Sequence, residues 1–574
     1  MIDYRIEIAD AHAHLYRVTL TVPAPDAVQV LSLPVWIPGS YMVREFSRHL
    51  HRLQARQGRS ERQVEQVDKC RWQVRCEGRA ALTVVYEVYA FDTSVRAAFL
   101  DDRRGFFNGT GLCLRVEGRD AQPHRLRLGR LPAGWQVATA MPPGAREREY
   151  LCADYDELVD HPVELGAFWR GRFAVRGVPH EFVVAGAWPG FDGARLLADA
   201  QRICEAQAGF WHGRGKPPVA RYVFLLNAVE DGYGGLEHRA STALICARRQ
   251  LPRSGMAEAN DGYVTLLGLI SHEYFHTWNV KRLKPREFAQ FDYGRENYTR
   301  LLWFFEGFTS YYDDLLLRRA GLIDAPRYLR LLGRTVAGVL ATPGRQRQSV
   351  AEASFDAWIK YYRSDENTPN ATISYYAKGS LVALALDLSL RSGGRGSLDE
   401  VMRRLWTQSR GGPIDEADIA AALQAVGGRS FAAELMAWVH GTGELPLRML
   451  LEQAGVAWLD EPTDLAAELG LRVSEGPVSG VQVKSVLHGS AAQQAGVSAG
   501  DELLAVDGWR LRRLDDARGW LQPGRPFELT LVRDQRLRVL KLQPPRVPAR
   551  GLQLRLVEQP APAARALRQA WLGG

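Results

Sequence analysis

The sequence predicts a multidomain α+β protein with an all-β N-terminal domain, a mixed and largely helical middle domain, and a compact C-terminal domain of short strands. The length of 574 residues is about twice the size at which a single hydrophobic core stops growing. Apolar residues alternate with polar ones in the first third, follow helical spacing in the middle, and return to short alternating runs near the end. We therefore expect domains at residues 1–170, 171–456 and 457–545, with a tail at 546–574.

The strands expected in the first domain are short runs separated by Pro, Gly and Asp turns. They are YRIEI, LYRVTLTV, QVLSLPVWI, LTVVYEVYAF, GLCLRVEG and RLRLGRL. Alternation of this kind is typical of a half-buried strand, so we expect a β-sandwich or saddle. Two further segments, WIPGSYMVREF and GFFNGTG, are rich in aromatic and turn residues. They fit loops at the mouth of an active site and ordinary packed hairpin ends equally well.

The middle domain begins where the apolar period changes. A strand-like HEFVVAG leads into a helical GARLLADAQRICEAQAGFWHG and then into a buried strand, ARYVFLLNAV. Long helical patterns follow from residue 262 to about residue 442. The third domain returns to strands at LGLRV, GVQVKSV, DELLAVDG and FELTLVRD, with a small helix at SAAQQAG. A short amphipathic stretch lies in the tail, near residues 564–571.

Composition and charge narrow the function classes. Hydrophobic residues make up 46% and charged residues 24% of the chain, as in ordinary globular proteins. The formal net charge of +8 comes from scattered arginines with acidic residues between them, so we expect no nucleic-acid partner. The sequence shows neither a signal-peptide pattern nor an apolar run of about 18 residues, so we expect no membrane association. The six cysteines form no CxxC pair, which favours reduced thiols and a cytoplasmic location.

The segment ISHEYFHTWNV contains the main candidate site. Residues 263–277 have the spacing of a helix, in which His272 and His276 project from one face, about 6 Å apart along the axis. One cation can bridge two imidazoles at that spacing. The alternative is that both histidines are surface residues or are satisfied within the core. Glu273 points about 100° around the helix from His272, so it is placed as a proton acceptor rather than as a ligand.

A zinc site for hydrolysis needs three protein ligands and one open position. The helical segment NYTRLLWFFEGFTSYYDDLLLRRAG contains Glu306 as the lone carboxylate among bulky apolar residues. Coordination of a cation removes the cost of burying such a charge, although an outward-facing glutamate remains the alternative. Gly307 allows close helix approach, and Asp313, two turns on, is a candidate acceptor for the N–H of a ligand histidine. These residues predict one Zn²⁺ per chain, activating a water for peptide-bond hydrolysis.

Four separated motifs carry a family resemblance. HEYFH, WFFEGF, GYGGLEH and SYYAKG together resemble the glycyl aminopeptidase family of gluzincin zinc metallopeptidases, and the similarity covers nearly the whole chain. The resemblance implies an N-terminal β domain, a thermolysin-like catalytic domain and a C-terminal PDZ domain, in that order.

The resemblance also implies roles for particular residues. Glu237 matches the carboxylate that holds the free α-ammonium of a substrate, and Gly234 and Gly235 match the strand edge along which substrate backbone lies. Tyr376 matches the phenol that donates a hydrogen bond to the developing oxyanion, with the adjacent Tyr375 as the alternative. An edge-strand surface carboxylate and a core tyrosine are the competing interpretations of Glu237 and Tyr376. His238 stands where the related aminopeptidase N group carries Asn.

The third domain resembles a bacterial-type PDZ module, with Ala491 in place of a usual proline. Its expected ligand loop is Leu469, Gly470 and Leu471, and a C-terminal peptide is its possible partner. The expected function is zinc-dependent removal of glycine or alanine from peptides with a free N-terminus, where the residue preference comes from the resemblance alone. A zinc endopeptidase on the same scaffold is one alternative. A PDZ-centred peptide-binding protein with an inactive peptidase domain is the other.

Overall fold

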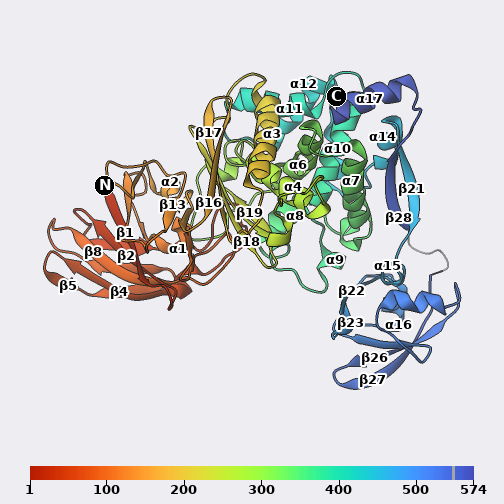
Figure 1. Ribbon diagram of the computed structural model, residues 1–574, viewed down its shortest axis with the longest axis horizontal. Helices are drawn as coiled ribbons and strands as arrows, with labels where there is room; N and C mark the ends of the chain where they lie inside the picture. Colours follow the sequence, from red (N-terminus) through yellow and green to blue (C-terminus); the bar gives the residue numbers. More distant parts are fainter. Residues whose placement is uncertain (477, 546–549, 574) are drawn as a thin grey trace. The chain divides into compact units, whose positions relative to one another are not determined.

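The computed structural model describes residues 1–476, 478–545 and 550–573. A β-rich N-terminal part, a helical middle and a β-rich C-terminal part follow one another along the chain, which confirms the expected fold class (Figure 1). Residue contacts divide the chain into two compact units. The first unit comprises Met1–Tyr298, Tyr312–Leu322 and Met402–Asp415, and the second comprises Thr299–Tyr311, Ile323–Val401 and Glu416–Gly574.

Within residues 1–168, all of which are described, three sheets make up the N-terminal part of the first unit. A seven-stranded sheet has the order β14-β12-β1-β2-β8-β4-β5, and two four-stranded sheets have the orders β13-β15-β10-β9 and β11-β3-β7-β6. The bounds are β1 Ile2–Asp10, β2 Leu15–Val22, β3 Val28–Ser32, β4 Leu50–Gln57, β5 Ser60–Arg62, β6 Val64–Asp68, β7 Arg71–Arg75, β8 Leu82–Tyr89, β9 Phe99–Leu100, β10 Arg104–Phe107, β11 Arg115–Val116, β12 His124–Leu128, β13 Gln136–Ala138, β14 Glu149–Cys152 and β15 Val163–Gly166. Alternating apolar side chains from these strands form one core.

The expected strand GLCLRVEG is wrong over most of its length. Its first residues belong to the short helix α1 (Gly109–Leu112), and only the two residues of β11 pair with a neighbouring strand. The carbonyls of residues 112–114 accept hydrogen bonds from three buried tyrosine hydroxyls at 2.6 to 2.7 Å, those of Tyr86, Tyr155 and Tyr4. These hydroxyls satisfy backbone groups that a strand would pair in a ladder, so the segment is buried without being a strand.

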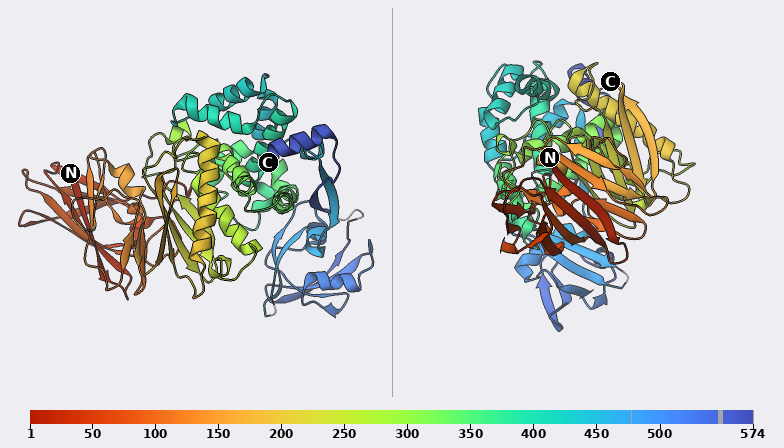
Figure 2. Two further views of the ribbon diagram at one scale, coloured as in Figure 1. Left: turned by 45° about the horizontal axis from the view of Figure 1, so that its top comes forward. Right: turned by 90° about the vertical axis from the view of Figure 1, so that its left-hand side faces the viewer.

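A five-stranded mixed sheet follows in the first unit, with the order β16-β17-β18-β20-β19. Its strands are β16 Trp169–Val175, β17 Val178–Ala185, β18 Tyr222–Val229, β19 Tyr233–Glu237 and β20 Ser241–Ala247. Helix α3 (Gly193–His212, yellow) packs on β16 and on α4 (Asp261–Phe275), and it lies along the sheet in both Figure 1 and Figure 2. β19 pairs only with β20 among the described strands, so its other edge carries backbone groups outside the ladder.

The second unit is helical up to residue 453 and then forms strands. Its helices are α5 Leu302–Phe305, α7 Ala325–Leu340, α8 Val350–Phe355, α9 Thr368–Ala371, α10 Ala377–Ser392, α12 Glu416–Gly427, α13 Ala432–Leu435 and α14 Leu447–Gln453. Two helices, α6 (Gly307–Arg319) and α11 (Leu398–Ser409), run without interruption from the second unit into the first.

The PDZ-like part of the second unit is inserted between two paired strands, β21 (Val456–Pro462) and β28 (Arg550–Leu556). Its described elements are α15 Leu465–Leu469, β22 Leu471–Gly476, β23 Gly480–Val486, α16 Ala491–Ala495, β24 Glu502–Val506, β25 Trp509–Arg510, β26 Phe527–Arg533 and β27 Arg536–Leu542. After β28 the chain forms α17 (Pro562–Leu572), whose Trp571 is fully buried and donates a hydrogen bond to Tyr311 Oη at 3.0 Å. The last segment therefore packs as part of this unit.

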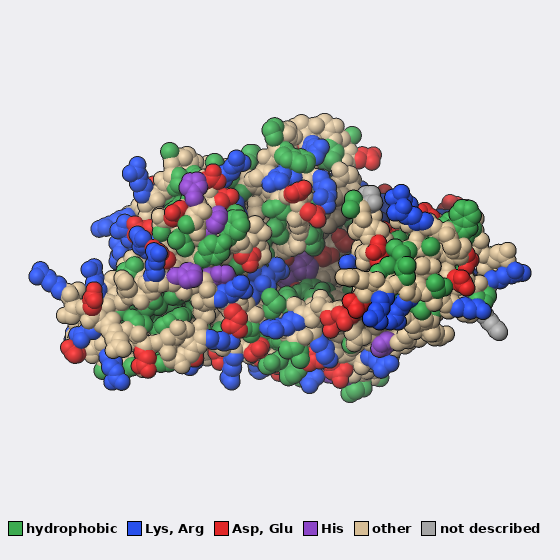
Figure 3. Space-filling model, turned by 90° about the horizontal axis from the view of Figure 1, so that it is seen from below, with side chains coloured by type: hydrophobic (Ala, Val, Ile, Leu, Met, Phe, Trp, Pro, Cys, Tyr) green, Lys and Arg blue, Asp and Glu red, His purple; other side chains and the backbone are tan. Residues whose placement is uncertain are grey.

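The described residues also bear on the state of the cysteines, on membrane-spanning helices and on surface charge. All six cysteines lie among them, and each is buried and outside any disulfide. No helix in the described part of the chain has the length and apolarity that a bilayer crossing requires. Basic and acidic side chains are interspersed over the face that Figure 3 shows.

Candidate metal centre and active site

Helix α4 carries the HEYFH motif. Asn260 caps it by accepting a hydrogen bond from the Tyr263 N–H at 2.8 Å, a contact that satisfies one of the open donors at a helix start. The apolar residues Tyr263, Leu267, Ile270 and Tyr274, which recur at helical spacing, are all buried. The helix ends at Phe275, two residues earlier than expected, and His276 forms its C-cap with helical backbone angles.

Both histidines of the motif are oriented through Nδ1. The carboxylate of Asp313 lies 3.1 Å from His272 Nδ1, and the carbonyl oxygen of Asn279 lies 2.6 Å from His276 Nδ1. Because these oxygens accept, each Nδ1 carries its proton and each Nε2 presents a lone pair. The two Nε2 atoms face each other 3.1 Å apart.

That arrangement fits a metal ion. Two lone pairs at this distance repel each other unless a cation lies between them. Two nitrogens bound tetrahedrally to one zinc ion lie roughly 3.3 Å apart, given Zn–N distances near 2.0 to 2.1 Å. Among the described residues, two groups of three side chains offer ligand atoms within 4.8 Å of one another: His272, His276 and Glu306, and Glu237, Glu273 and His276. The donor set of the first group, two imidazoles and one carboxylate, is one that zinc prefers.

Glu273 lies against the edge strand β19. The residue is 5% exposed, and a Cβ at Gly235 would come within 2.1 Å of the Glu273 Oε1 atom. No side chain fits at position 235 while Glu273 keeps this place. The glycine expected to admit substrate backbone is thus also required by the carboxylate of Glu273.

Glu237, the last residue of β19, is 5% exposed and lies against a loop of the N-terminal part. A Cβ at Gly39 would lie 2.5 Å from both Glu237 carboxylate oxygens, and Gly39 has a φ of +93°. Gly39 belongs to the segment WIPGSYMVREF. Its contact with Glu237 favours a loop at the candidate site over an ordinary packed hairpin end. The other segment, GFFNGTG, is buried, and its Asn108 donates to the carbonyls of Val95 and Ala97.

Gly39→Ala is expected to lower kcat/KM for peptide substrates by about 100-fold, because the added methyl group displaces the Glu237 carboxylate by about 1 Å or more. Steady-state kinetics on a dipeptide measure this. Gly78→Ala is the matched control: Gly78 also has a positive φ, +65°, but an added Cβ meets nothing within 4 Å. Equal losses in both variants would show that backbone strain, and not the contact with Glu237, causes the effect.

His238 follows Glu237 and turns toward a buried ionic cluster. Its Nδ1 lies 3.3 Å from Asp160 Oδ1, and the Lys281 ammonium lies 2.8 Å from the same oxygen. Burial opposes ionisation of Asp160, but Lys281 and His238 outweigh it and hold the pKa of this carboxyl below its ordinary value. Burial also lowers the pKa of His238, against the pull of Asp160. This cluster fixes the backbone at the end of β19.

In the second unit, Glu306 is 2% exposed, which confirms its expected burial. Its neighbour Gly307 allows close packing, since a Cβ there would come within 2.6 Å of the Gly379 backbone. Leu301 is the N-cap of α5, and its N–H donates a hydrogen bond to Thr299 Oγ at 3.3 Å. The apolar residues on either side of Glu306, residues 301–305 and Phe308, are all buried.

Tyr375 and Tyr376 differ in their surroundings. Tyr375 is fully buried, whereas Tyr376 is partly exposed at the start of α10. Burial, and next the negative charge of Glu306, raise the pKa of the Tyr376 phenol well above its ordinary value. Tyr376 is therefore protonated at neutral pH and able to donate a hydrogen bond.

Comparisons with known proteins agree with this geometry. Family models match at residues 3–167 (peptidase M61 N-terminal domain), 265–382 (M61 glycyl aminopeptidase) and 482–533 (PDZ domain). A crystal structure described as an aminopeptidase N family protein from Idiomarina loihiensis is 37% identical, with 100% of each chain covered and a TM-score of 0.94. The chain belongs to the M61 glycyl aminopeptidase family. The resemblance expected from the four motifs is thereby confirmed.

More distant structures also match this M61 chain. An M1 zinc metallopeptidase from Deinococcus radiodurans is 16% identical over 78% of this chain and 94% of its own, with a TM-score of 0.47. A Legionella pneumophila aminopeptidase A in complex with aspartic acid is 11% identical over 96% of this chain and 57% of its own, with a TM-score of 0.48. A comparison with curated protein sequences finds no match. The family membership makes the chain a peptidase of the metallopeptidase class.

Residues 469–471, the predicted ligand loop of the PDZ-like part, lie at the junction of α15 and β22. Leu469 and Leu471 are buried in the core of this part, and Gly470 between them has a φ of +75°. The carbonyl of Gly470 accepts a hydrogen bond from the Leu487 N–H at 2.8 Å. The loop is thus anchored by its side chains and one backbone bond.

No periodic signal in the sequence marks Gly39 or the carbonyl of Asn279 as parts of the site. The turn residues of WIPGS were the available sign for Gly39. The Asn279 carbonyl depends on the turn that follows α4, which the helical spacing does not specify.

Proposed function

We propose that this M61 family member is a zinc aminopeptidase that removes a small N-terminal residue, glycine or alanine, from peptides with a free N-terminus. His272, His276 and Glu306 hold one zinc ion per chain. The observation that carries the proposal is the facing pair of Nε2 atoms, 3.1 Å apart with both Nδ1 atoms engaged, next to the buried carboxylate of Glu273. The preference for small residues rests on the family alone.

The place of Glu306 as third ligand follows from one helix. Asp313 of α6 contacts His272, and Glu306 precedes Asp313 by seven residues on a backbone whose hydrogen bonds run on from Glu306 O to Ser310 N. Seven residues make about 700° of rotation, so Glu306 and Asp313 lie on the same face, two turns apart. The helix thus directs one carboxylate toward the metal and the other toward a metal-binding imidazole. Asp313 holds the tautomer and ring orientation of His272.

Each remaining residue has a defined task in hydrolysis. A bound zinc ion supplies Lewis-acid activation of the water and of the scissile carbonyl. Glu273 accepts a proton from the attacking water as the C–O bond forms, and it delivers that proton to the leaving amine as the C–N bond breaks. Tyr376 donates a hydrogen bond to the oxyanion that develops on the carbonyl oxygen.

Glu237 binds the N-terminal ammonium group of the substrate and so directs cleavage to the first peptide bond. Its carboxylate lies within 4.8 Å of Glu273 and His276, so an ammonium group held there is next to the reacting centre. Gly234 and Gly235, upstream on β19, offer a strand edge for the substrate backbone.

The proposed domains remain residues 1–170, 171–456 and 457–545, with a tail at 546–574. The last boundary adjoins residues 546–549, which the structure does not describe. A C-terminal peptide is the proposed ligand of the PDZ loop.

Blocking the substrate amine tests the proposal. The purified protein is expected to contain one zinc ion and to hydrolyse glycine p-nitroanilide, with loss of activity on chelation. N-acetylation of a glycyl peptide is expected to lower kcat/KM at least about 10-fold, since a charge-assisted contact to Glu237 is lost. Equal turnover of blocked and free peptides would favour an endopeptidase. Absence of both metal and hydrolysis would favour a peptide-binding protein.

A further inference from the structure

Arg96 is a half-buried cation beside the proposed substrate strand. Its guanidinium donates to the carbonyl of Gly235 on β19 at 3.2 Å, and one terminal nitrogen lies 3.7 Å from where a Cβ of Gly234 would be. Its Nε–H is buried without a hydrogen-bond partner, and Arg96 forms no ion pair with any described residue. A partly desolvated arginine without an anion is costly, so its position requires another explanation.

The loop that carries Arg96 is held in place from both sides. Asn108, which is fully buried, donates to Val95 O at 3.0 Å and to Ala97 O at 3.4 Å, so its amide brackets the arginine. Within the loop, Ser94 Oγ accepts from the Arg96 N–H, and Asp92 accepts from the Ser94 N–H. The guanidinium is thus presented to β19 by an ordered loop.

The position of Arg96 matches the length of a short peptide. Gly235 and Glu237 are two residues apart on β19, which is about 7 Å along an extended strand. Two residues of extended peptide span about the same distance. A peptide whose ammonium group is held by Glu237 therefore brings its carboxylate near Arg96 when it is two or three residues long.

We propose that Arg96 binds the C-terminal carboxylate of the substrate and that dipeptides and tripeptides with a free carboxylate are the preferred substrate class. Guanidinium and carboxylate pair through two parallel N–H to O bonds, and Arg96 has donors for both besides the one it gives to Gly235. This inference rests on the proposed aminopeptidase function and extends it to recognition of the C-terminal end of the substrate.

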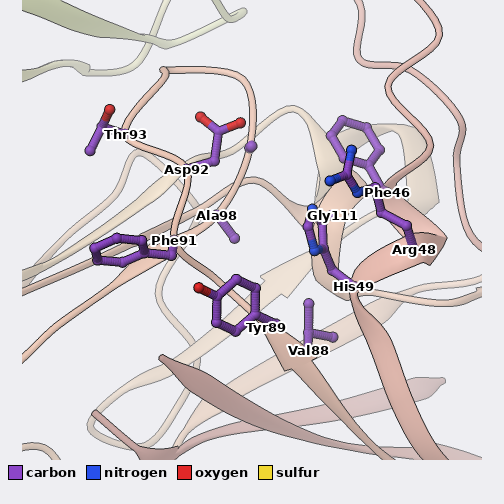
Figure 4. A pocket seen from close by; sticks show the side chains of 11 residues that line it. Phe46, Arg48, His49, Val88, Tyr89, Phe91, Asp92, Thr93, Ala98 and Gly111 are labelled. Carbon is purple, nitrogen blue, oxygen red and sulfur yellow. The ribbon is translucent and has the colours of Figure 1, made fainter. Parts of the chain in front are cut away.

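A second cation of the same domain supplies the matched control. Arg48 is exposed and lines a cavity of about 450 Å³ together with Phe46, His49, Tyr89 and Phe91 (Figure 4). The outer residues of the Arg96 loop, Phe91 to Thr93, also line this cavity. Arg48→Gln removes the same charge as Arg96→Gln without touching β19, and it tests whether the carboxylate binds in this cavity instead.

The experiment compares Gly-Gly with its C-terminal amide. The wild-type protein is expected to show at least about 10-fold higher kcat/KM for the free acid, and Arg96→Gln is expected to reduce this ratio to about 1. Arg48→Gln is expected to keep the wild-type ratio. The inference is overturned if the wild-type ratio is near 1, if Arg96→Gln slows both substrates equally, or if Arg48→Gln is the variant that loses the ratio.

Binding measurements keep the result independent of turnover. Calorimetry on the Glu273→Gln variant is expected to show that Gly-Gly binds at least about 10-fold more tightly than its amide. When Arg96→Gln is added to that variant, the two ligands are expected to bind about equally. Equal binding of acid and amide to Glu273→Gln overturns the inference. Failure of the wild-type protein to hydrolyse glycine p-nitroanilide, which has no carboxylate, would instead count against the proposed function.

Discussion

Replacing Glu273 by Gln is expected to lower kcat by about 100- to 10,000-fold while the protein keeps its zinc ion. Gln has the shape of Glu and fits beside Gly235, but its amide cannot accept the proton of the attacking water. Because Glu273 is not a ligand in the proposed site, metal content is expected to stay at one ion per chain. Metal analysis and the kinetics of glycine p-nitroanilide hydrolysis on one sample measure both quantities.

Glu258→Gln controls for the loss of one negative charge near the same helix. Glu258 is exposed and precedes the Asn260 cap of α4, so its substitution is expected to leave both kcat and metal content unchanged. Loss of zinc in Glu273→Gln would mean that Glu273 is a ligand. Wild-type turnover in that variant would mean that another group moves the proton.

The local parts of this site could be predicted because they depend on neighbours along the chain. The spacing of His272 and His276 and the apolar stripe of α4 follow from helical geometry alone. The burial of Glu306 follows from the bulky residues on either side of it. In each case the sequence within about two turns contains the information.

The parts that could not be predicted depend on contacts between distant segments. Gly39 lies almost 200 positions before Glu237, and nothing in its own neighbourhood indicates which carboxylate it will touch. The segment of residues 111–118 has a strand-like pattern, yet the hydroxyls of Tyr4, Tyr86 and Tyr155, far away in the sequence, satisfy the carbonyls of residues 112–114. Period-two alternation records which side chains are buried and leaves open what pairs with the backbone.

The C-terminal tail combines a helix that its own sequence predicts with a distant contact that its sequence does not predict. Its amphipathic pattern predicts a short helix, and α17 is that helix. The fixed position of Trp571 depends on Tyr311, which in turn donates to the fully buried Asp387 at 2.6 Å. Because Tyr311 lies on α6 between Glu306 and Asp313, the end of the chain packs on the helix that directly follows Glu306, the proposed third metal ligand. No local signal connects these residues.

Glu306→Ala is expected to weaken zinc binding at least about 100-fold, since a substitution of a group that only orients a ligand already costs about 10- to 100-fold. Asp313 only orients His272, so Asp313→Asn is expected to weaken zinc binding less. Zinc affinity is therefore expected to fall from the wild type to Asp313→Asn and further to Glu306→Ala. Competition with a chelator of known affinity measures the three dissociation constants. Equal zinc affinity in Glu306→Ala and the wild type would remove Glu306 from the ligand set.

Thermal unfolding separates metal binding from folding in these variants. Glu306→Gln removes the charge and keeps the shape, so the metal-free variant is expected to unfold at a temperature no lower than that of the metal-free wild type, because a buried carboxylate without a cation is unfavourable. With zinc added, the wild type is expected to gain more in Tm than the variant, since an ion that binds the native state stabilises it in proportion to its affinity. A metal-free Glu306→Gln variant with a much lower Tm would show that Glu306 serves the fold, and equal gains on adding zinc would show that the ion is held without it.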